Sequence, residues 1–417
     1  MADRLAIVQV TPFAWEVANE VNEYVARVSD ELCERGHAVL IMAPSQDPSL
    51  VQESRRALRG DPQSLLDRAA DQPLVLGVGE VLSFAPTRRR APSLPLDVAR
   101  TIEQALETLP LDVVHVHEPF APSASSVALR HSCALNVGSF HTPTERVLST
   151  QLARPLTRLL FGRLDARIAS YPATRELMAG YFPGEYRLIL PGAAGVPSGA
   201  DAPRDAFELF ATADEERAAL RVLLRALRAL PTSLQWRATV WAQTPLAIPA
   251  TLGARLRGRV EVVDAATLGE AEALARADAA VLASEGLRPA PGTLVRALAA
   301  GVVPVASALP VYDELLSDGE YGLQFAAGDS QTLASQLGRL IGDAQLLARK
   351  RAELAGLRQK FSWSRVADDL EAVYAEIAAR RHDAVGNGRV RTRLSSRRLI
   401  DVDLHMHTDH SYDCATP

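Results

Sequence analysis

Short apolar runs alternate with amphipathic segments along most of the chain. Leu5–Val10 is such a run, and it ends at Thr11-Pro12. From Asn19 to Arg35 the apolar side chains recur at helical spacing, until Gly36 ends the predicted helix. His37–Met42 is the next apolar run. A strand, a helix and a second strand in this order form a β-α-β unit, which predicts a parallel sheet.

The alternation continues in two series, and the breaker-rich stretch from Pro191 to Pro203 between them predicts a hinge. Two such series predict an α/β protein of two lobes, with a cleft that suits a small ligand. Further strands are predicted at residues 75–84 (a pair), 113–116, 135–140, 166–170, 186–190, 236–241, 260–263, 279–282 and 303–306. Further helices are predicted at residues 96–109, 123–130, 173–182, 215–230, 268–276, 294–300, 312–316, 330–357 and 363–379.

The stretch from Asp112 to Arg146 places histidines at the ends of two predicted strands. The first strand ends in His117-Glu118-Pro119 and the second in His141-Thr142-Pro143. Ligands of open parallel sheets bind beyond the carboxyl ends of the strands, so these polar ends are candidate binding residues. The alternative is that both histidines are structural residues whose partners lie within the protein.

Composition and charge exclude several classes of protein. A net charge of -5 and a pI near 6.0 do not favour a nucleic-acid partner. Three widely spaced cysteines argue against a disulfide framework and for a reducing cytosol. No apolar stretch approaches the roughly 20 residues that span a bilayer, and the N-terminal run is too short for a signal peptide. We therefore expect a cytoplasmic protein, at most peripheral at the inner membrane face.

Two basic segments lie outside the predicted sheets. Arg88-Arg89-Arg90 precedes the helix at 96–109 and is either a solvated loop or a contact with an anionic surface such as phospholipid or phosphate. Residues 381–398 are rich in arginine, glycine and serine, which predicts a flexible linker. A fresh apolar run at 399–404 follows and ends in His405-Met406-His407. We therefore expect the start of a further domain at 399–417.

The motifs in this order resemble family 4 glycosyltransferases, especially phosphatidylinositol mannosyltransferases. The matching segments are "DVVHVHEPFAPS" with "FHTPT", "ERGHAVLIMAPS", "ALAAGVVPVAS", "DGEYGLQFAAGD" and "FSWSRVADDLEAVY". The resemblance implies a GT-B fold of two Rossmann-like lobes: an acceptor lobe at residues 1–195 and a nucleotide-sugar lobe at 196–380 whose last helix crosses back. It also implies sugar transfer with retention and without an obligatory metal.

The resemblance assigns site residues on both sides of the cleft. On the acceptor side, His141 is expected beside the transferred sugar as a catalytic residue, with His117, Glu118 and Thr142 near the acceptor. On the donor side, the N-terminus of the helix at 294–300 would face the phosphates, since free N–H groups there attract anions. The donor-side candidates are Arg217, Gly286, Arg288, Gly292, Thr293 and Arg296, with Glu285 as a second catalytic residue.

The donor side departs from the family pattern. Ala213 and Ala218 stand where the family has the arginine and lysine that hold the diphosphate, which leaves Arg217 as the nearest cation. Of the family's two glutamates eight positions apart, the second falls at Arg296. The first falls at Arg288, or at Glu285 if the loop is three residues longer. The glycine-rich turn after the first strand is replaced by residues 16–20. Arg288 and Arg296 either restore the missing charge or are plain surface arginines.

The terminal "IDVDLHMHTDHSYD" resembles the first motif of the polymerase and histidinol phosphatase (PHP) domains. There, residues in the positions of His405 and His407 bind divalent metal for phosphoester hydrolysis. The later ligands of that site are absent, so a metal is expected only if the full PHP domain is present.

Three functions remain open at this point. The first is a hexosyltransferase that moves sugar from a UDP- or GDP-sugar to a lipid-linked or small polyol acceptor, with possible peripheral membrane contact. The second is a catalytically degenerate GT-B module that binds a ligand or supports a PHP phosphoesterase. The third is a hydrolase whose chemistry lies beyond Pro417. Binding of UDP or GDP separates the first two.

Overall fold

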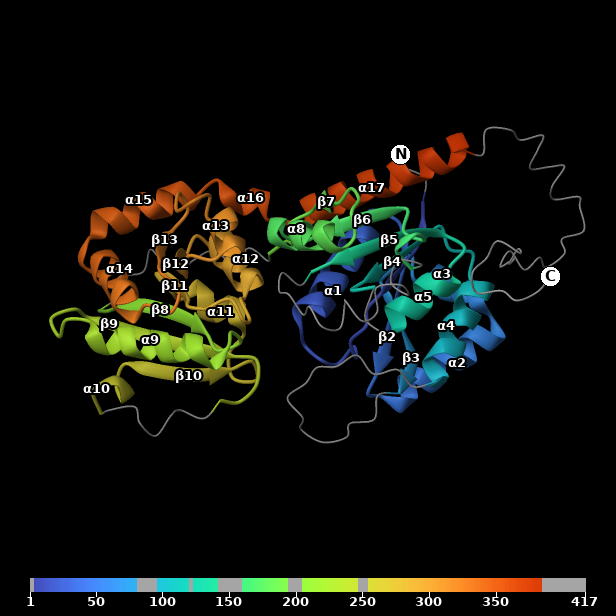
Figure 1. The fold of residues 1–417 in the computed structure, drawn as a ribbon. Helices are drawn as coiled ribbons and strands as arrows, with labels where there is room; N and C mark the ends of the chain where they lie inside the picture. Colours follow the sequence, from blue (N-terminus) through green and yellow to red (C-terminus); the bar gives the residue numbers. More distant parts are fainter. Residues whose placement is uncertain are drawn as a thin grey trace, which may run out of the picture. The chain divides into compact units, whose positions relative to one another are not determined.

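The computed structural model describes residues 4–80, 96–119, 123–141, 160–193, 205–246 and 254–384, and it contains two parallel β-sheets (Figure 1). Met1–Tyr374, which holds both sheets, forms one compact unit, and Ala375–Pro417 forms a second. The expected α/β architecture of two Rossmann-like domains is confirmed.

The first sheet has seven strands in the order β3-β2-β1-β4-β5-β6-β7, and every neighbouring pair is parallel. Its strand order reverses between β1 and β4, which is where ligands bind in open parallel sheets. Its strands are β1 (Ala6–Val10), β2 (Ala38–Ser45), β3 (Leu74–Glu80), β4 (Val113–His117), β5 (Leu135–Phe140), β6 (Ala166–Ala169) and β7 (Arg187–Leu188).

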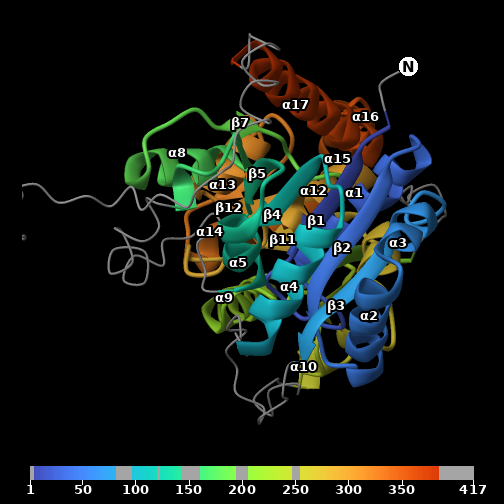
Figure 2. The ribbon, with the colours of Figure 1, turned by 90° about the vertical axis from the view of Figure 1, so that its right-hand side faces the viewer.

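The two faces of this sheet differ in chemistry, because successive side chains of a strand point to opposite faces. One face is apolar: Val8, Val10, Val114 and Val116 join the core under α2, α4 and α5 (Figure 2). The alternate positions of β1, β4 and β5 carry the buried polar residues Gln9, His115, His117 and Ser139. The helices of this half are α1 (Glu20–Glu34), α2 (Pro48–Gly60), α3 (Pro62–Arg68), α4 (Leu96–Thr108), α5 (Ala124–His131) and α8 (Pro172–Tyr181).

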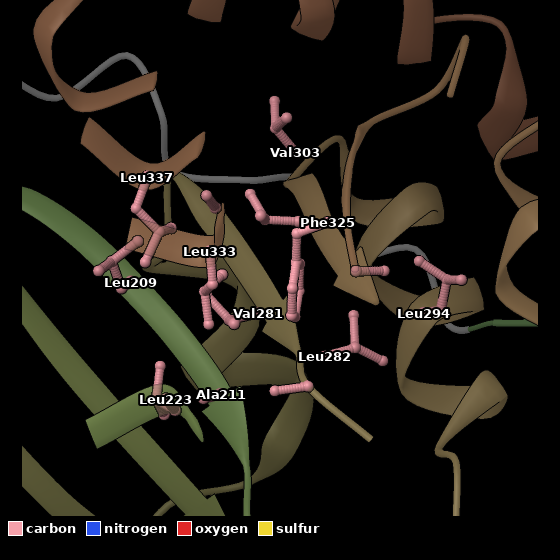
Figure 3. Close-up of a cluster of buried hydrophobic side chains, with 14 of the residues drawn as sticks. Leu209, Ala211, Leu223, Val281, Leu282, Leu294, Val303, Phe325, Leu333 and Leu337 are labelled. Carbon is pink, nitrogen blue, oxygen red and sulfur yellow. The ribbon is translucent and has the colours of Figure 1, made fainter. Parts of the chain in front are cut away.

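The second sheet has six parallel strands in the order β10-β9-β8-β11-β12-β13. The close-up of its core shows Leu209, Val281 and Phe325 from three strands against Leu223 of α9 and Leu333 of α14 (Figure 3). The strands are β8 (Phe207–Thr212), β9 (Trp236–Ala242), β10 (Val260–Asp264), β11 (Ala279–Leu282), β12 (Val303–Ser307) and β13 (Leu323–Phe325). The helices are α9 (Arg217–Ala229), α10 (Ala254–Arg257), α11 (Glu270–Ala275), α12 (Pro291–Ala300), α13 (Pro310–Leu315), α14 (Ser330–Gly342), α15 (Ala344–Leu354), α16 (Leu357–Lys360) and α17 (Trp363–Ala384).

Several sequence predictions about single elements were wrong. The predicted helix at 330–357 is two helices, because Asp343 ends α14 and caps the first turn of α15 by accepting the Leu346 N–H at 2.9 Å, and α16 begins only at Leu357. The central strand β8 was not predicted, since Glu208 interrupts its apolar run. The predicted strand pair at 75–84 is one strand as far as Glu80, and the rest lies outside the described residues. Helix α12 begins at Pro291, so Gly292 lies in its first turn.

The ends of the chain and the linkers are not covered by the description. The predicted lobe boundary at 195/196, the three arginines at 88–90, the linker at 381–398 beyond Ala384 and the PHP-like segment with His405 and His407 all lie outside the described residues. Among the residues that the structure does describe, none of the helices combines the length and apolarity needed to cross a membrane.

Asp343→Ala tests the break between α14 and α15. Removing an N-cap carboxylate that satisfies a helix N–H costs about 1 kcal/mol, so the free energy of unfolding from urea denaturation is expected to fall by that amount. Asp343→Asn is the matched control, because asparagine also caps helices well, and it should retain most of the stability. An unchanged free energy in the alanine variant would contradict the capping role.

Candidate functional site

A small hollow lies between the carboxyl ends of the first sheet and the N-terminus of α12. His141, directly after β5, lines it as predicted. Gly292 and Arg296 of α12 line it too, and both were predicted on the donor side. The other lining residues are Glu20, Glu23, Tyr24, Tyr171, Pro191, Gly192 and Trp363. Thr142, the remaining acceptor-side candidate, lies outside the described residues.

Both ring nitrogens of His141 are bonded within the protein. Its Nε2 lies 2.9 Å from Nδ1 of His117, and its Nδ1 lies 2.7 Å from the hydroxyl of Ser170 at the end of β6. The backbone N–H of His141 donates to Oε1 of Glu118 at 2.8 Å. The ring of Tyr24 meets the His141 ring edge-on at 4.8 Å between centroids. These contacts fix the orientation of His141 at the wall of the hollow.

His117 and Glu118 support His141 from behind and do not line the hollow. The side chain of His117 is fully buried, and its Nε2 lies 2.8 Å from Oε1 of Gln9 on β1. Glu118 has a φ of 48°, a left-handed conformation that is costly for a residue with a side chain. In this conformation the Glu118 carboxylate accepts the backbone N–H of His141. The alternative reading of His117 as a histidine satisfied within the protein matches this geometry.

Burial keeps these histidines neutral. It lowers the pKa of His141 to about 3. It also lowers the pKa of His117 well below its ordinary value, and the neighbouring His115 and His141 lower that pKa further. At neutral pH each ring therefore carries one proton, so each donates through one nitrogen and accepts through the other. His141 is consequently a polar but uncharged wall of the hollow.

The opposite wall is a cluster of charges around Arg296. Its guanidinium lies 2.8 Å from Glu270, 3.6 Å from Glu23 and 3.9 Å from Glu20. Burial alone would lower the pKa of Arg296, but the carboxylates of Glu270, Glu23 and Glu20 outweigh it and hold that pKa above its ordinary value. Arg296 is therefore neither a surface arginine nor an unshared cation.

A carboxylate also lies against the N-terminus of α12. Gly292, in the first turn, is so close to Glu20 that a Cβ at this position would lie 2.4 Å from the carboxylate oxygen Oε1. Negative charge is stabilised near a helix N-terminus, where N–H groups have no partner in the helix. Glu20 thus occupies the place at which the sequence predicted a phosphate. Thr293, the other candidate in this turn, donates its hydroxyl to Glu270 at 2.7 Å.

The β11–α12 loop shows the same arrangement with two adjacent glutamates. Glu216 accepts the backbone N–H groups of Glu285 at 2.5 Å and Arg288 at 2.9 Å. Glu215, which is buried, accepts those of Ala283 and Ser284 and the hydroxyl of Tyr312 at 2.7 Å. Four amide donors of this loop are therefore already bonded to carboxylates of this chain.

The other donor-side candidates lie around this loop and outside the hollow. The side chains of Glu285 and Arg288 are exposed, and so is that of Arg217, the first residue of α9. Gly286 has a φ of 99°, which a residue with a side chain rarely adopts. The structure thus brings Gly292 and Arg296 together with His141 but leaves Glu285, Arg288 and Arg217 apart from it.

Three aromatic residues of the hollow were not predicted as site residues. Tyr24 lies within the predicted helix at 19–35, Tyr171 lies between two predicted elements, and Trp363 lies in the segment "FSWSRVADDLEAVY", to which no binding role was assigned. The Tyr24 hydroxyl, the Trp363 Nε1 and the Arg296 Nε are buried polar atoms with no hydrogen-bond partner within the protein. The free space beside them is about 30 Å³, enough for one or two water molecules. As it stands, the hollow is too small for a sugar.

Comparison with known proteins gives this geometry its context. Residues 21–193 match Glycosyltransferase Family 4, and residues 209–343 match Glycosyl transferases group 1, so the two matches cover most of the chain. A phosphatidyl-myo-inositol mannosyltransferase of Mycobacterium leprae (strain TN) is 28% identical over 392 residues, which are 90% of this chain and 97% of that protein. The chain belongs to the GT-B glycosyltransferases.

Solved structures of glycosyltransferases share the fold. A glycosyltransferase from Rickettsia africae has a TM-score of 0.65 at 15% identity, covering 90% of this chain and 99% of that one. HepE of Anabaena, crystallised with UDP and glucose, has a TM-score of 0.62 at 15% identity, covering 89% of this chain and 100% of its own. At these identities the comparison establishes the arrangement of the strands and helices, while the site residues rest on the geometry of this glycosyltransferase.

Within the described part of this glycosyltransferase, no group of three or more His, Cys, Asp or Glu side chains is placed to hold a metal ion. The predicted metal ligands His405 and His407 belong to the PHP-like segment outside that part.

Glu215→Gln tests the electrostatics of the loop. Burial raises the pKa of Glu215 to about 7, despite the lowering influence of the Tyr312 hydroxyl and the loop amides. The folded protein therefore keeps a proton that the unfolded chain loses near pH 4.5, so this group's stabilising contribution is present below about pH 4.5 and is lost as pH rises to about 7. The loss amounts to at most about 3 kcal/mol.

Urea denaturation between pH 4.5 and 8 measures this effect. The variant Glu215→Gln should show a flatter fall of unfolding free energy between pH 4.5 and 7 than the unaltered protein. Glu261→Gln, at an exposed position of β10, is the control and should keep the original slope. Parallel curves for Glu215→Gln and the unaltered protein would show that Glu215 is ionised throughout this range.

Proposed function

We propose that this protein transfers a hexose from a UDP- or GDP-sugar to a lipid-linked or small polyol acceptor, with retention. The observation that carries the proposal is the similarity to a phosphatidyl-myo-inositol mannosyltransferase along 90% of the chain. The match also covers 97% of the relative's own length. The N-terminal domain is assigned to the acceptor and the C-terminal domain to the donor.

The wall formed by His141 is suited to a neutral polyhydroxylated ligand. Aromatic rings of Tyr24, Tyr171 and Trp363 provide apolar surface, and buried polar atoms of Tyr24 and Trp363 lack a partner. Leaving such a group unbonded costs about 1–3 kcal/mol, which a hydroxyl of the acceptor or of the transferred sugar would recover. His141 is proposed to lie beside the transferred sugar as an oriented, uncharged residue.

The donor is proposed to bind at the β11–α12 loop and the first turn of α12. In the structure, Glu216 accepts two backbone N–H groups of the loop, and Glu20 lies against the N-terminus of the helix. A diphosphate has to displace these carboxylates, after which the same N–H groups stabilise the negative charge that develops on the leaving group. Arg288 and Arg217 are exposed near the loop and supply positive charge, so the proposed transfer requires no metal cofactor.

Peripheral contact with the inner face of the membrane belongs to the same proposal, because a lipid-linked acceptor lies in the bilayer surface. The acceptor lobe would then face the membrane. Acceptors dispersed in vesicles and free polyols distinguish the two acceptor classes in a transfer assay.

Isothermal titration calorimetry with UDP and GDP is the primary test. One of the two nucleotides should bind with a dissociation constant below one millimolar, and the corresponding nucleotide sugar should be consumed when vesicles with phosphatidylinositol or free myo-inositol are added. The absence of binding by either nucleotide up to millimolar concentration would overturn the proposal and favour a module without turnover.

The variant Glu285→Ala tests the donor loop. We expect it to lower the transfer rate at least about 100-fold, as the loss of a group that stabilises developing charge does. Glu261→Ala, which removes an exposed glutamate on β10, is the matched control and should keep the full rate. An unchanged rate in Glu285→Ala would mean that Glu285 does not hold the catalytic position and that Arg288 corresponds to it.

A further inference from the structure

A chain of hydrogen bonds runs behind His141 through the first sheet, reaches Tyr374 on α17 and returns to Ser139 of β5. Beyond His117 it continues through Gln9, whose amide Nε2 lies 3.4 Å from the hydroxyl of Tyr374. The same hydroxyl lies 2.7 Å from Nδ1 of His115, and Nε2 of His115 lies 2.7 Å from the hydroxyl of Ser139. We call this set the histidine chain: Ser139, His115, Tyr374, Gln9, His117, His141 and Ser170.

The histidine chain is shielded from water over most of its length. Gln9, His115, His117 and Ser139 have no exposed surface, and Tyr374 is 1% exposed. The rings of His115 and His117 are stacked at 4.6 Å and those of His117 and His141 at 5.1 Å. Burial lowers the pKa of His115 to about 3, as it lowers that of His141. Each of these three contacting rings is therefore neutral and carries one N–H proton.

The bonds of the histidine chain determine one another, because each needs one donor and one acceptor. The Gln9 oxygen faces His117, so Nε2 of His117 carries the proton and its Nδ1 accepts. His141 must then donate through Nε2 and accept the Ser170 hydroxyl at Nδ1.

On the other arm, the Gln9 amide N–H is donated to Tyr374, which passes its own proton to Nδ1 of His115. His115 then donates through Nε2 to Ser139. All three histidines are protonated on Nε2.

One alternative arrangement of the protons forms the same number of hydrogen bonds. If the Gln9 amide were reversed, each donor and acceptor would exchange roles and all three histidines would be protonated on Nδ1. The direction of the whole chain therefore depends on which end of Gln9 faces Tyr374. The Tyr374 hydroxyl can accept from the Gln9 nitrogen or donate to its oxygen, so it fits both directions. In the structure the nitrogen faces Tyr374 and the oxygen faces His117, which gives the Nε2-protonated direction.

We propose that Tyr374 is a positioning residue for His141: by binding the Gln9 amide nitrogen it keeps the Gln9 oxygen on His117, and His141 thereby stays Nε2-protonated with its Nδ1 accepting from Ser170. The assignment of His141 to sugar transfer rests on the proposed function, but the protonation pattern does not. Tyr374 lies on α17, so the helix that follows the second sheet determines the hydrogen-bonding state of a residue at the end of the first. Nothing in the sequence motifs marks Tyr374, Gln9 or Ser170 for this role.

The variant Tyr374→Phe removes the hydroxyl and keeps the ring. Gln9 then loses the acceptor of its amide nitrogen and its link to His115, so both directions of the His117–His141 arm become accessible. Two-bond ¹H–¹⁵N spectra of protein labelled at histidine report which ring nitrogen carries the proton, and His141→Gln assigns the His141 signals. We expect a single Nε2-protonated pattern for His141 in the unaltered protein and a mixture of both forms in Tyr374→Phe.

Tyr186→Phe is the matched control. The Tyr186 hydroxyl donates to the Phe182 carbonyl at 2.9 Å, away from the histidine chain, so its loss removes a hydrogen bond without touching His141. This control should keep the Nε2 pattern. If Tyr374→Phe does not fold, Gln9→Met breaks the same arm at its centre and should give the same mixture. An unmixed Nε2 pattern in the folded Tyr374→Phe or Gln9→Met variant would overturn the proposal and leave Tyr374 as a packing residue.

Kinetics separate this proposal from the proposed function. Where transfer is measured, Tyr374→Phe should lower kcat about 10- to 100-fold with KM nearly unchanged, because a misoriented group at the reacting centre costs that order of rate. A lower kcat with an unmixed Nε2 pattern would contradict positioning through the histidine chain. If no nucleotide sugar is consumed by the unaltered protein, the proposed function fails, while the spectra still decide the role of Tyr374.

Discussion

A buried polar side chain must find a hydrogen-bond partner, and this constraint organises the candidate site. The central strands β1, β4 and β5 place Gln9, His115, His117 and Ser139 on one face of the first sheet, where no water reaches them. An unmatched donor or acceptor there costs about 1–3 kcal/mol, so the strands alone would leave a row of costly groups. Tyr374 of α17 and Ser170 after β6 complete the set. The orientation of His141 at the end of β5 is a consequence of that completed network.

Beside the second sheet, the groups that need partners are backbone N–H donors, and carboxylates accept from them. The β11–α12 loop turns four N–H groups toward Glu215 and Glu216, and the first turn of α12 lies against Glu20. Carboxylates of this chain therefore hold the backbone N–H groups of this region. Arg296 balances three of the nearby negative charges, those of Glu20, Glu23 and Glu270.

The sequence allowed most of the fold to be predicted, because strand and helix patterns are local. The strands Leu135–Phe140 and Ala279–Leu282 have the predicted limits, and Asn19 begins α1 as its cap. The candidate site was predicted only in part. Alternation places His115 and His117 on one face, but it does not show that Gln9 bonds to His117 or that Tyr374 bonds to Gln9 and His115. Those contacts join residues more than one hundred positions apart, and only the register of the parallel strands and the path of α17 determine them.

The two walls of the hollow differ in how easily they move. On the first-sheet side, His141 is held by buried bonds between neutral groups, and displacing one member leaves others unbonded. On the α12 side, Glu20 and Glu23 are about half-exposed and lie 3.9 and 3.6 Å from Arg296, and ion pairs of that kind contribute at most about 1 kcal/mol. Glu20 and Glu23 belong to α1, so we expect a ligand larger than the present space to enter by separating Arg296 of α12 from these two glutamates, while the buried bonds of His141 stay in place. The weaker of the two sets of contacts is the one that a ligand displaces first.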